Sequence, residues 1–341
     1  MGLNISEIIP RKEIQLKDLK AKTIAVDAYN TIYQFLTTIR QPDGTPLMDK
    51  NKKITSHLSG LLYRNINLID EGIKLIYVFD GKPNELKFKT LEKRQENKKE
   101  AEVKFREAKE LEDEEQMRKY SSQFVKITDE IIQQSKELLD ALGIPYIEAL
   151  GEGEAEAAHL AKINKAWASA SQDYDSILFG APKLIRNLTL ARKRKTISGY
   201  VDVNPELIEL EHVLNHLGIN KDQLICLGIL VGTDFNPGGV KGIGQKRALD
   251  IVRKFQFPVK IFEAVANDTR YLIDFNWQDI YHIFHEPECC TEPNIVFKKV
   301  DEKKVKSLLL SHDFSEDRID SALQKIRDLE EKNKQKSLSS F

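Results

Sequence analysis

Three short apolar runs, rich in β-branched residues, each stop at or just before an aspartate. Runs of this kind are typical of strands in a parallel sheet that is covered on both faces. The runs and their acids are residues 23–26 with Asp27, residues 73–79 with Asp80, and residues 166–171 with Asp173 and Asp175. Two shorter apolar runs, residues 144–147 and 184–190, predict further strands.

Between these runs, apolar residues recur at the spacing of amphipathic helices. Helices are predicted over residues 28–36, 55–69, 128–142, 155–163 and 221–231. We also expect a short helix before Pro10, a capped helix that begins at Asn204, a mixed helical region over 258–330 and a disordered tail after Glu330. Strands that alternate with helices predict an α/β fold, with a mostly parallel central sheet and helices on both of its faces.

Residues 82–123 differ from the rest of the chain, because Lys, Arg and Glu alternate there and apolar residues are few. Opposite charges four residues apart favour a helix, but no apolar stripe is present to bury it, so we expect an exposed helical hairpin. Lys87 and Arg94 are seven residues apart and therefore share one face of the helix. They follow closely on Asp80, and this position predicts a charged lid whose two cations face a phosphate backbone.

The acids at the strand ends are predicted to converge. Ligands of open α/β sheets bind outside the carboxyl ends of the strands, so neighbouring strands would bring these acids into one crevice. Glu152 and Glu154, at the predicted start of a helix, would lie beside them. Taken alone, the acids between 152 and 175 would be surface charges with a helix cap among them. Asp27 and Asp80, at two other strand ends, favour a common site instead.

A cluster of carboxylates requires compensating charge. Packed carboxylates repel one another, and some must bind a proton unless cations are present. Oxygen ligands select hard divalent cations, of which Mg²⁺ is the default, so the cluster predicts a magnesium site that holds two ions. Two such ions about 4 Å apart can hold the attacking and leaving oxygens of a phosphodiester.

Residues 232–249 contain closely spaced glycines and cations after a predicted helix. The glycines predict a tight hairpin whose backbone N–H groups can approach a phosphate, and the cations add charge where a helix N-terminus already favours anions. Helix-hairpin-helix elements bind DNA backbones in this way, without reading sequence. The glycines are Gly239, Gly242 and Gly244, the cations are Lys241, Lys246 and Arg247, and Asp234 just before the hairpin is a seventh acid.

The composition limits the alternatives. At 341 residues the chain can form one large domain or two, and its formal net charge of −1 gives no overall basic bias towards nucleic acid. Its three cysteines form neither a disulfide framework nor a zinc spacing, which favours a reducing intracellular compartment. No apolar run reaches the roughly 18 residues of a membrane helix, and no secretory signal is recognised, so we expect no membrane association.

Several of these segments resemble the flap endonuclease family in its archaeal form. They occur in the family's order, span residues 1 to about 257, and continue at residues 312–318. A resemblance of this length is far more specific than any single motif. The matching segments are 26–28 (Val-Asp-Ala), 32–36, 39–41, 55–58 (Thr-Ser-His-Leu), 77–83 (Tyr-Val-Phe-Asp-Gly-Lys-Pro), 152–155 (Glu-Gly-Glu-Ala), 170–175 (Ala-Ser-Gln-Asp-Tyr-Asp) and 232–244.

The resemblance implies a structure-specific 5′-flap endonuclease with 5′–3′ exonuclease activity. Such enzymes remove 5′ flaps in DNA replication (Okazaki fragment maturation) and in base excision repair, by two-metal hydrolysis of a phosphodiester. The resemblance also implies a PIN-like nuclease fold with a helical gateway, or arch, and a helix-two-turn-helix element that binds DNA. The expected cofactors are two Mg²⁺ ions per subunit, with Mn²⁺ as a substitute, and a K⁺ ion at the helix-hairpin element.

Site residues carried over from the resemblance fall into four groups. The active-site cations of the gateway are Lys87 and Arg94, and the metal ligands are Asp27, Asp80, Glu152, Glu154, Asp173, Asp175 and Asp234. The DNA contacts are Gly2, Tyr33, Arg40, Arg64, Glu152, Gly232, Asp234, Gly239, Lys241, Gly242, Gly244, Lys246 and Arg247. The residues Gln335, Leu338 and Phe341 match the clamp-binding motif Gln-x-x-Leu-x-x-Phe-Phe, which ends here after one aromatic residue.

The same resemblance suggests partners and boundaries. The expected partners are branched DNA with a 5′ flap and the sliding clamp (PCNA), and the protein is expected to be a cytoplasmic, nucleoid-associated monomer. The regions are 1–98 (N-terminal nuclease), 99–115 (part of the arch), 116–257 (internal nuclease with the helix-hairpin element), 258–330 (C-terminal helices) and 331–341 (clamp-binding tail). The chain departs from the family pattern at Leu150-Gly151, where Pro-Ser is usual, and at Phe235, where Tyr is usual.

Two other functions stay open. The first is a catalytically silent scaffold that binds branched DNA and recruits the clamp, although the presence of all seven acids argues against it. The second is a ribonuclease built on a similar carboxylate-edged sheet. The long charged insertion and the glycine hairpin are additions that a minimal ribonuclease does not need.

Overall fold

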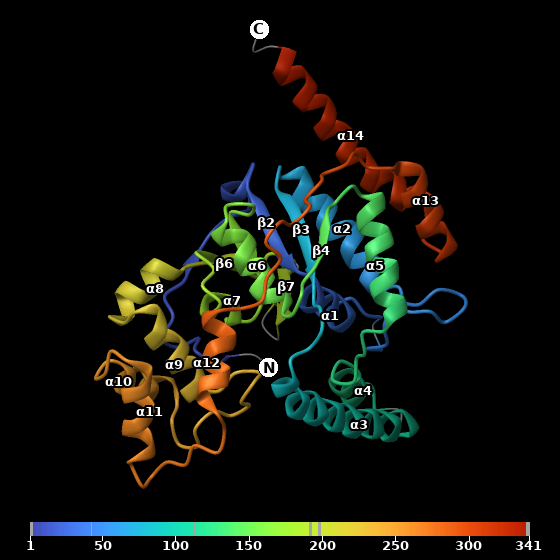
Figure 1. Ribbon diagram of the computed structural model, residues 1–341. Helices are drawn as coiled ribbons and strands as arrows, with labels where there is room; N and C mark the ends of the chain where they lie inside the picture. Colours follow the sequence, from blue (N-terminus) through green and yellow to red (C-terminus); the bar gives the residue numbers. More distant parts are fainter. Residues whose placement is uncertain (1–2, 42, 112, 191–192, 197–198, 339–341) are drawn as a thin grey trace.

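The computed structural model describes residues 3–41, 43–111, 113–190, 193–196 and 199–338. A central sheet lies between two groups of helices, and a pair of charged helices projects away from it (Figure 1). Among the described residues, no helix combines the length and the apolar character needed to cross a membrane.

The central sheet has seven strands in the order β1-β9-β6-β5-β2-β3-β4. Strands β2 to β6 pair in parallel, whereas β9 is antiparallel to β6 and β1 is antiparallel to β9. The strands are β1 Lys12–Glu13, β2 Thr23–Asp27, β3 Lys74–Phe79, β4 Tyr146–Glu148, β5 Ala168–Ala170, β6 Lys183–Arg186 and β9 Glu206–Glu209, and a separate hairpin consists of β7 Lys193–Thr196 and β8 Gly199–Asp202. The predicted mostly parallel sheet is confirmed.

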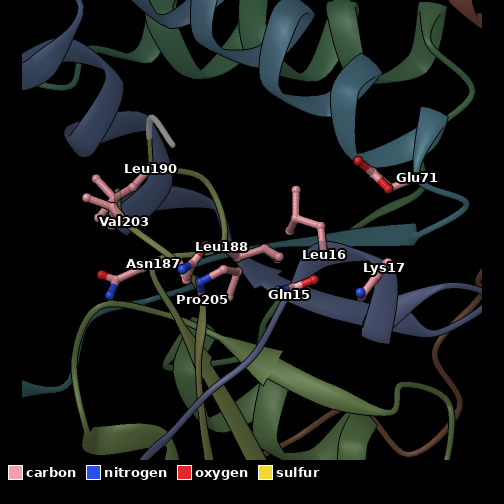
Figure 2. Close-up of a pocket in the computed structure, with 10 residues that line it drawn as sticks. Gln15, Leu16, Lys17, Glu71, Asn187, Leu188, Leu190, Val203 and Pro205 are labelled. Atoms are coloured by element: carbon pink, nitrogen blue, oxygen red, sulfur yellow. The ribbon is translucent and has the colours of Figure 1, made fainter. Parts of the chain in front are cut away.

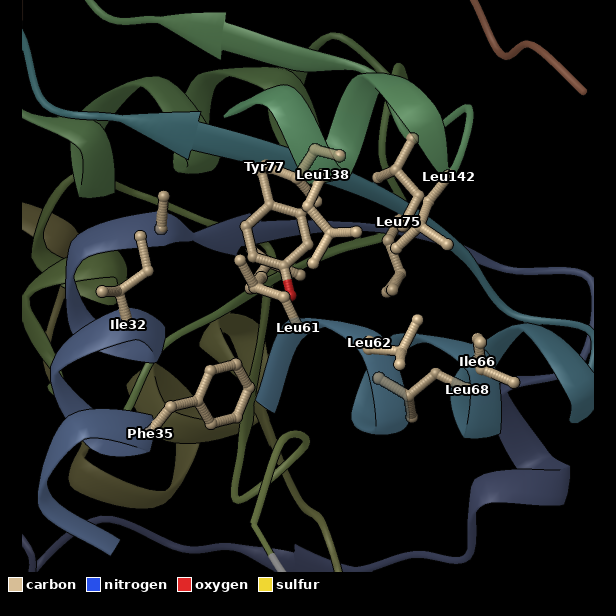
Figure 3. Close-up of a cluster of buried hydrophobic side chains, with 14 of the residues drawn as sticks. Ile32, Phe35, Leu61, Leu62, Ile66, Leu68, Leu75, Tyr77, Leu138 and Leu142 are labelled. Atoms are coloured by element: carbon tan, nitrogen blue, oxygen red, sulfur yellow. The ribbon is translucent and has the colours of Figure 1, made fainter. Parts of the chain in front are cut away.

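Successive side chains along each strand point to opposite faces of the sheet, so they contribute to two different cores. In β2, Ile24 and Val26 face one core, while Ala25 faces the other side of the sheet. The first core packs under α1, α2, α5, α13 and α14, and Figure 3 shows its side chains between α2, α5 and β3. In that core the buried Tyr77 hydroxyl donates to Asn65 Oδ1 at 2.7 Å, so its polar atom is satisfied. Helix α6 packs on the opposite face of the sheet, against β2, β3 and β5, and α7 to α12 form a second cluster beside it.

The helices follow the predicted spacing closely. Those of the first layer and the arch are α1 Ala28–Thr38, α2 Ser56–Asp70, α3 Phe88–Glu110, α4 Glu114–Ser121, α5 Asp129–Ala141, α13 Glu302–Ser311 and α14 Glu316–Leu338. Those of the second layer are α6 Gly153–Lys162, α7 Asp175–Leu178, α8 Leu210–Leu217, α9 Lys221–Val231, α10 Gln245–Val252, α11 Pro258–Ala266 and α12 Trp277–His285. Short 3₁₀ turns occupy Leu16–Leu19 and Glu85–Lys87. Helices α3 and α4 confirm the predicted charged hairpin.

Three local predictions were wrong. Asn204 does not begin a helix, because strand β9 comes first and Glu209 caps α8. Pairing of β9 with β6 and β1 overrides the local helical preference. Residues 6–9 form a turn instead of a helix. The predicted disorder after Glu330 is also wrong, because α14 continues to Leu338. Once the buried first half of α14 has formed, each further helical residue adds little to the free-energy cost of the helix.

A strap of extended chain joins α12 to α13 across the end of α5. Lys298 N–H donates to Gly143 O at 3.1 Å, and Asp301 N–H donates to Ala141 O at 2.8 Å. Gly143 has φ +68°, and a Cβ atom there would lie 2.2 Å from Lys298 O. Both the backbone conformation and the close approach of the strap therefore require glycine at 143.

We expect Gly143→Ala to lower the free energy of unfolding by about 2–4 kcal/mol, the sum of a left-handed backbone cost and an overpacking cost. Gly218 is the matched control, because its φ is +61° and a Cβ atom added there would meet nothing within 4 Å. Gly218→Ala should cost only the backbone term, about 1–2 kcal/mol. Urea unfolding measures both values, and equal losses would show that the strap contact is unimportant.

Candidate active site

Two of the seven acids lie at the ends of adjacent parallel strands. Asp27 ends β2 and caps α1, where its Oδ1 accepts a hydrogen bond from Asn30 N–H at 3.0 Å. Asp80 follows β3, and its Oδ1 accepts from Gly153 N–H at 2.8 Å. A Cβ atom at position 153 would lie 2.6 Å from that oxygen, so glycine permits the close approach. The strand register places Asp27 opposite Val78, and both acids therefore lie at the same edge of the sheet.

The start of α6 contributes two more acids. Glu152 is the N-cap residue of α6, and its carboxylate pairs with the Lys87 ammonium. Glu154 lies in the first turn, where acids suit the positive end of the helix dipole. Its Oε1 atom is buried and has no hydrogen-bond partner.

The turn after β5 carries Asp173 and Asp175. Asp173 Oδ2 accepts a hydrogen bond from Asn30 Nδ2 at 3.0 Å. Asp175 begins α7 and is buried, with 6% of its surface exposed and no partner for its Oδ1. Because Val26 lies opposite Ala170, this turn emerges beside Asp27.

The arch meets the seventh acid. Arg94 Nη2 lies 2.6 Å from Asp234 Oδ1, and Lys87 Nζ lies 4.0 Å from Asp234 Oδ2. Thr90 Oγ1 donates to the Asp234 carbonyl oxygen at 2.6 Å. The two predicted arch cations therefore do face the acids, although most of α3 is exposed.

The acids form one electrostatic network. Burial raises the pKa of Asp27, and the charge of Asp80 raises it further. Burial also raises the pKa of Glu154, with further contributions from Asp175 and Asp173. The pKa of Asp175 is raised by burial and then by the charges of Asp234 and Asp173. Burial lowers the pKa of Lys87, but the neighbouring carboxylates outweigh burial, so the pKa of this ammonium group is raised overall.

This donor set fits hard divalent cations. All seven groups are carboxylates, and two of their buried oxygens, Glu154 Oε1 and Asp175 Oδ1, have no partner within the protein. Among the described residues, no group of three or more acid, histidine or cysteine side chains is already arranged to hold a metal ion. Lys87 lies among the acids and supplies part of the charge that they require. The seven residues remain predicted metal ligands.

Three predicted DNA contacts, Tyr33, Arg40 and Arg64, lie on the first helical layer, and they differ in how exposed their side chains are and in whether other groups already bind them. Tyr33 is 38% exposed, with Lys98 Nζ 5.8 Å from the centre of its ring. Arg40 is bound to its own loop, donating to Leu36 O at 3.0 Å and to Gly44 O at 2.6 Å. Arg64 is half-buried, and burial lowers the pKa of its guanidinium. Tyr33 is thus the group of these three that a nucleotide can reach most directly.

The glycine hairpin joins α9 to α10 as predicted. Gly232 has φ +112°, and a Cβ atom there would lie 2.5 Å from Gly239 N. Asn236 braces the turn by donating to Ile229 O at 2.7 Å and accepting from Thr233 Oγ1 at 2.7 Å. The charged residues of the hairpin, Lys241, Lys246 and Arg247, and its glycines at 242 and 244 are exposed.

Some predicted residues fall outside the described part. Gly2 and Phe341 lie outside the described residues. The backbone of Gln335 and Leu338 belongs to the end of α14, but their side chains are outside the described set. The clamp-binding motif therefore stays a prediction.

Sequence reasoning missed two side chains that hold the Asp173 turn. One is Asn30, and the other is Arg186 at the end of β6. Arg186 Nε donates to Gln172 O at 3.0 Å, and its Nη1 donates to the Tyr174 hydroxyl at 2.7 Å. Nothing in the local sequence marks Arg186, because its role depends on β6 lying next to β5.

Two cavities lie away from the acids. One of about 290 Å³ is lined by residues that include Gln15, Leu16 and Asn187 (Figure 2). Another of about 420 Å³ lies between α2 and α14, beside Tyr63 and Arg318. Neither of these two cavities contains any of the seven carboxylates.

Comparison with known proteins gives consistent matches. The XPG N-terminal domain matches residues 4–101, and the XPG I-region matches residues 143–234. "Flap endonuclease 1" of Pyrococcus furiosus is 50% identical over 344 residues, covering 100% of this chain and 99% of that relative.

Comparison with solved structures also gives matches that cover nearly the whole chain. The flap endonuclease-1 from Methanococcus jannaschii is 40% identical, with a TM-score of 0.75 over 96% of this chain and 98% of that one. The catalytic core of Rad2 in complex with DNA substrate is 24% identical, with a TM-score of 0.70 over 92% of this chain and 95% of that one, and it supports the fold alone. Given two family models and near-complete coverage at half identity, the chain belongs to the flap endonuclease family.

Proposed function

We propose that this protein is a magnesium-dependent hydrolase that cuts 5′ flaps from branched DNA, with 5′–3′ exonuclease activity as well. The observation that carries the proposal is the grouping of seven carboxylates. Four lie at or just after the ends of strands β2, β3 and β5, two belong to the start of α6, and Asp234 follows α9, while Lys87 pairs with Glu152 and Arg94 pairs with Asp234. The relatives named flap endonuclease support the choice of substrate.

The carboxylates would hold two divalent ions, Mg²⁺ or Mn²⁺. When bound, such ions lower the pKa of a water molecule and stabilise charge on a phosphate. Lys87 and Arg94 would transfer their contacts from Glu152 and Asp234 to the oxygens of the scissile phosphate, where positive charge stabilises the transition state. Tyr33, exposed beside the arch, offers an aromatic face on which an unpaired base can stack.

Duplex DNA would bind at the glycine hairpin between α9 and α10. Its backbone N–H groups and its three exposed cations suit phosphates, and a K⁺ ion there would add further charge. Contacts of this kind position a duplex without reading its bases. Selection of flaps would then come from DNA shape.

We base the proposed cellular role on membership of the flap endonuclease family. We place the protein in DNA replication and base excision repair, acting as a monomer on nucleoid DNA and bound to the sliding clamp through residues 331–341. The regions 1–98, 99–115, 116–257 and 258–330 remain the proposed functional divisions.

Asp173→Ala is expected to reduce the rate of cleavage of a 5′-flap substrate in Mg²⁺ by at least about 100-fold. This is a larger loss than is usual when a residue that only orients a metal ligand is removed. DNA binding should persist, because the hairpin is untouched. A flap-cleavage assay with a gel-shift control measures both. Binding without turnover in the unmutated protein would favour the silent scaffold, and faster cleavage of a matched RNA hairpin would favour the ribonuclease.

Asp175→Asn is expected to raise the melting temperature of the metal-free protein. Burial, and then the charges of Asp234 and Asp173, raise the pKa of Asp175 from 3.8 to about 7. The cost of ionising this group in the folded protein therefore grows as the pH rises between these values and is complete above about 7, where a neutral isostere removes it. Excess Mg²⁺ should stabilise the unmutated protein more than the variant. Thermal unfolding in EDTA and in Mg²⁺ tests this, and identical Mg²⁺ responses would argue against Asp175 as a ligand.

Lys87→Met is expected to lower kcat by about 100–1000-fold, as is typical when a group that stabilises transition-state charge is lost. Lys93→Met is the matched control, because Lys93 is an exposed lysine of helix α3, which begins directly after Lys87. Single-turnover cleavage rates compare the two. Equal losses would mean that arch charge in general, and not Lys87, is required.

The double substitution Lys241→Ala and Lys246→Ala is expected to weaken duplex binding and to reduce the slope of log K against log salt by about 2, one unit for each lost phosphate contact. The loss should be the same for different base sequences. Fluorescence anisotropy over a salt series measures the slope, and an unchanged slope would place the duplex elsewhere.

A further inference from the structure

Asn30 touches both of the strand-end aspartates that lie closest to it. It occupies the third position of α1, and its backbone N–H donates to Asp27 Oδ1 at 3.0 Å. Its side-chain Nδ2 donates to Asp173 Oδ2 at 3.0 Å. Its Oδ1 accepts from Gln172 N–H at 3.3 Å, next to Asp173 in the turn.

The orientation of the Asn30 amide is determined by its neighbours. One end faces a carboxylate, which only accepts hydrogen bonds, and the other faces a backbone N–H, which only donates. A flipped amide would lose both bonds. An aspartate at this position could not donate to Asp173, and a leucine could make neither bond.

These contacts oppose the electrostatic repulsion between the carboxylates of Asp27 and Asp173. Asp27 ends β2 and Asp173 follows β5, and these two strands pair in parallel, so two carboxylates from different parts of the chain are brought to the same edge of the sheet. Two carboxylates that repel will turn or shift apart unless something fixes them. Asn30 is neutral and bonds to both, so it holds their separation without adding charge.

We propose that Asn30 is a positioning residue that fixes Asp173 relative to Asp27 and thereby sets the affinity of the site for a divalent cation. The inference rests on the proposed function. With Oδ2 of Asp173 held by the amide, Oδ1 is the oxygen that would bind a cation. Groups that orient metal ligands from behind usually change affinity or activity by 10–100-fold when removed, on the order of what is expected here.

If the Asn30 side chain only stabilised the fold, its loss would lower the stability of the protein without changing its affinity for Mg²⁺. The first turn of α1 is already capped by Asp27, through the backbone N–H of Asn30, and that bond survives any side-chain substitution. Gln34 is the matched control on the same helix. It is buried, and its Oε1 accepts from Thr189 Oγ1 at 2.6 Å, in a hydrogen bond that involves none of the seven acids.

The test measures metal binding directly. Asn30→Leu, Asn30→Ser and Gln34→Leu are compared with the unmutated protein by thermal unfolding over a Mg²⁺ series. Both Asn30 variants should need about 10–100-fold more Mg²⁺ for the half-maximal rise in melting temperature. Gln34→Leu should lower the melting temperature while leaving that Mg²⁺ midpoint unchanged.

Flap cleavage over the same Mg²⁺ series gives the second measurement. In the Asn30 variants the Mg²⁺ activation curve should shift by the same factor, while the affinity for flap DNA in Ca²⁺ stays within about twofold of the unmutated value, since positioning changes metal binding and not phosphate contacts.

Three results would overturn the proposal: an unshifted Mg²⁺ midpoint in folded Asn30 variants, an equal shift in Gln34→Leu, or failure of both Asn30 variants to fold. The third would assign Asn30 to the fold. The proposed function fails separately, if the unmutated protein cuts no flap. A shifted midpoint in a protein without flap cleavage would leave the positioning role standing and remove the substrate assignment.

Discussion

The mutual repulsion of buried carboxylates is the constraint on which the rest of this structure depends. Parallel strands β2, β3 and β5 end at one edge, and each delivers an acid there. The protein tolerates the cluster by giving several of these acids a donor: Asn30 for Asp27 and Asp173, Gly153 for Asp80, and Lys87 for Glu152. Even so, burial and like charge raise the pKa values of Asp27 and Glu154. Cations that bind these carboxylates in the folded protein would reduce their mutual repulsion and so stabilise the folded state.

The arch is linked to the same constraint. Helix α3 has few apolar residues, so it cannot be held by a core of its own. Its attachment to the body includes Lys87 with Glu152, Arg94 with Asp234, and Thr90 with the Asp234 carbonyl oxygen. Ions that neutralise the acids would weaken these ion pairs and release the two cations for a phosphate. In the proposed function, metal binding, arch position and substrate binding would therefore be coupled through the same few charges.

The rest of the fold keeps these groups in register. Alternation along β2 directs Ile24 and Val26 into one core and Ala25 into another, so the strand cannot slip without exposing one of them. The glycine hairpin follows α9, which packs against α10 and α12 on the opposite layer. The candidate site therefore lies between the edge of the sheet, the glycine hairpin that is proposed to bind duplex DNA, and the charged helices α3 and α4.

Much of this could be predicted from the sequence. Apolar periodicity located the parallel strands and most helices, and the acids at the strand ends indicated a common crevice, because both signals are local and the carboxyl ends of parallel strands must meet. The roles of Asn30 and Arg186 could not be predicted, since each depends on β5 pairing with a particular neighbour. The same is true of β9, where pairing replaced an expected helix, and of Arg40, whose guanidinium is held by its own loop. The sequence by itself determined which residues carry charge and which face the core. Only the tertiary structure decided which charges meet, because repulsion and hydrogen bonding act between residues that lie far apart in the chain, 143 positions in the case of Asn30 and Asp173.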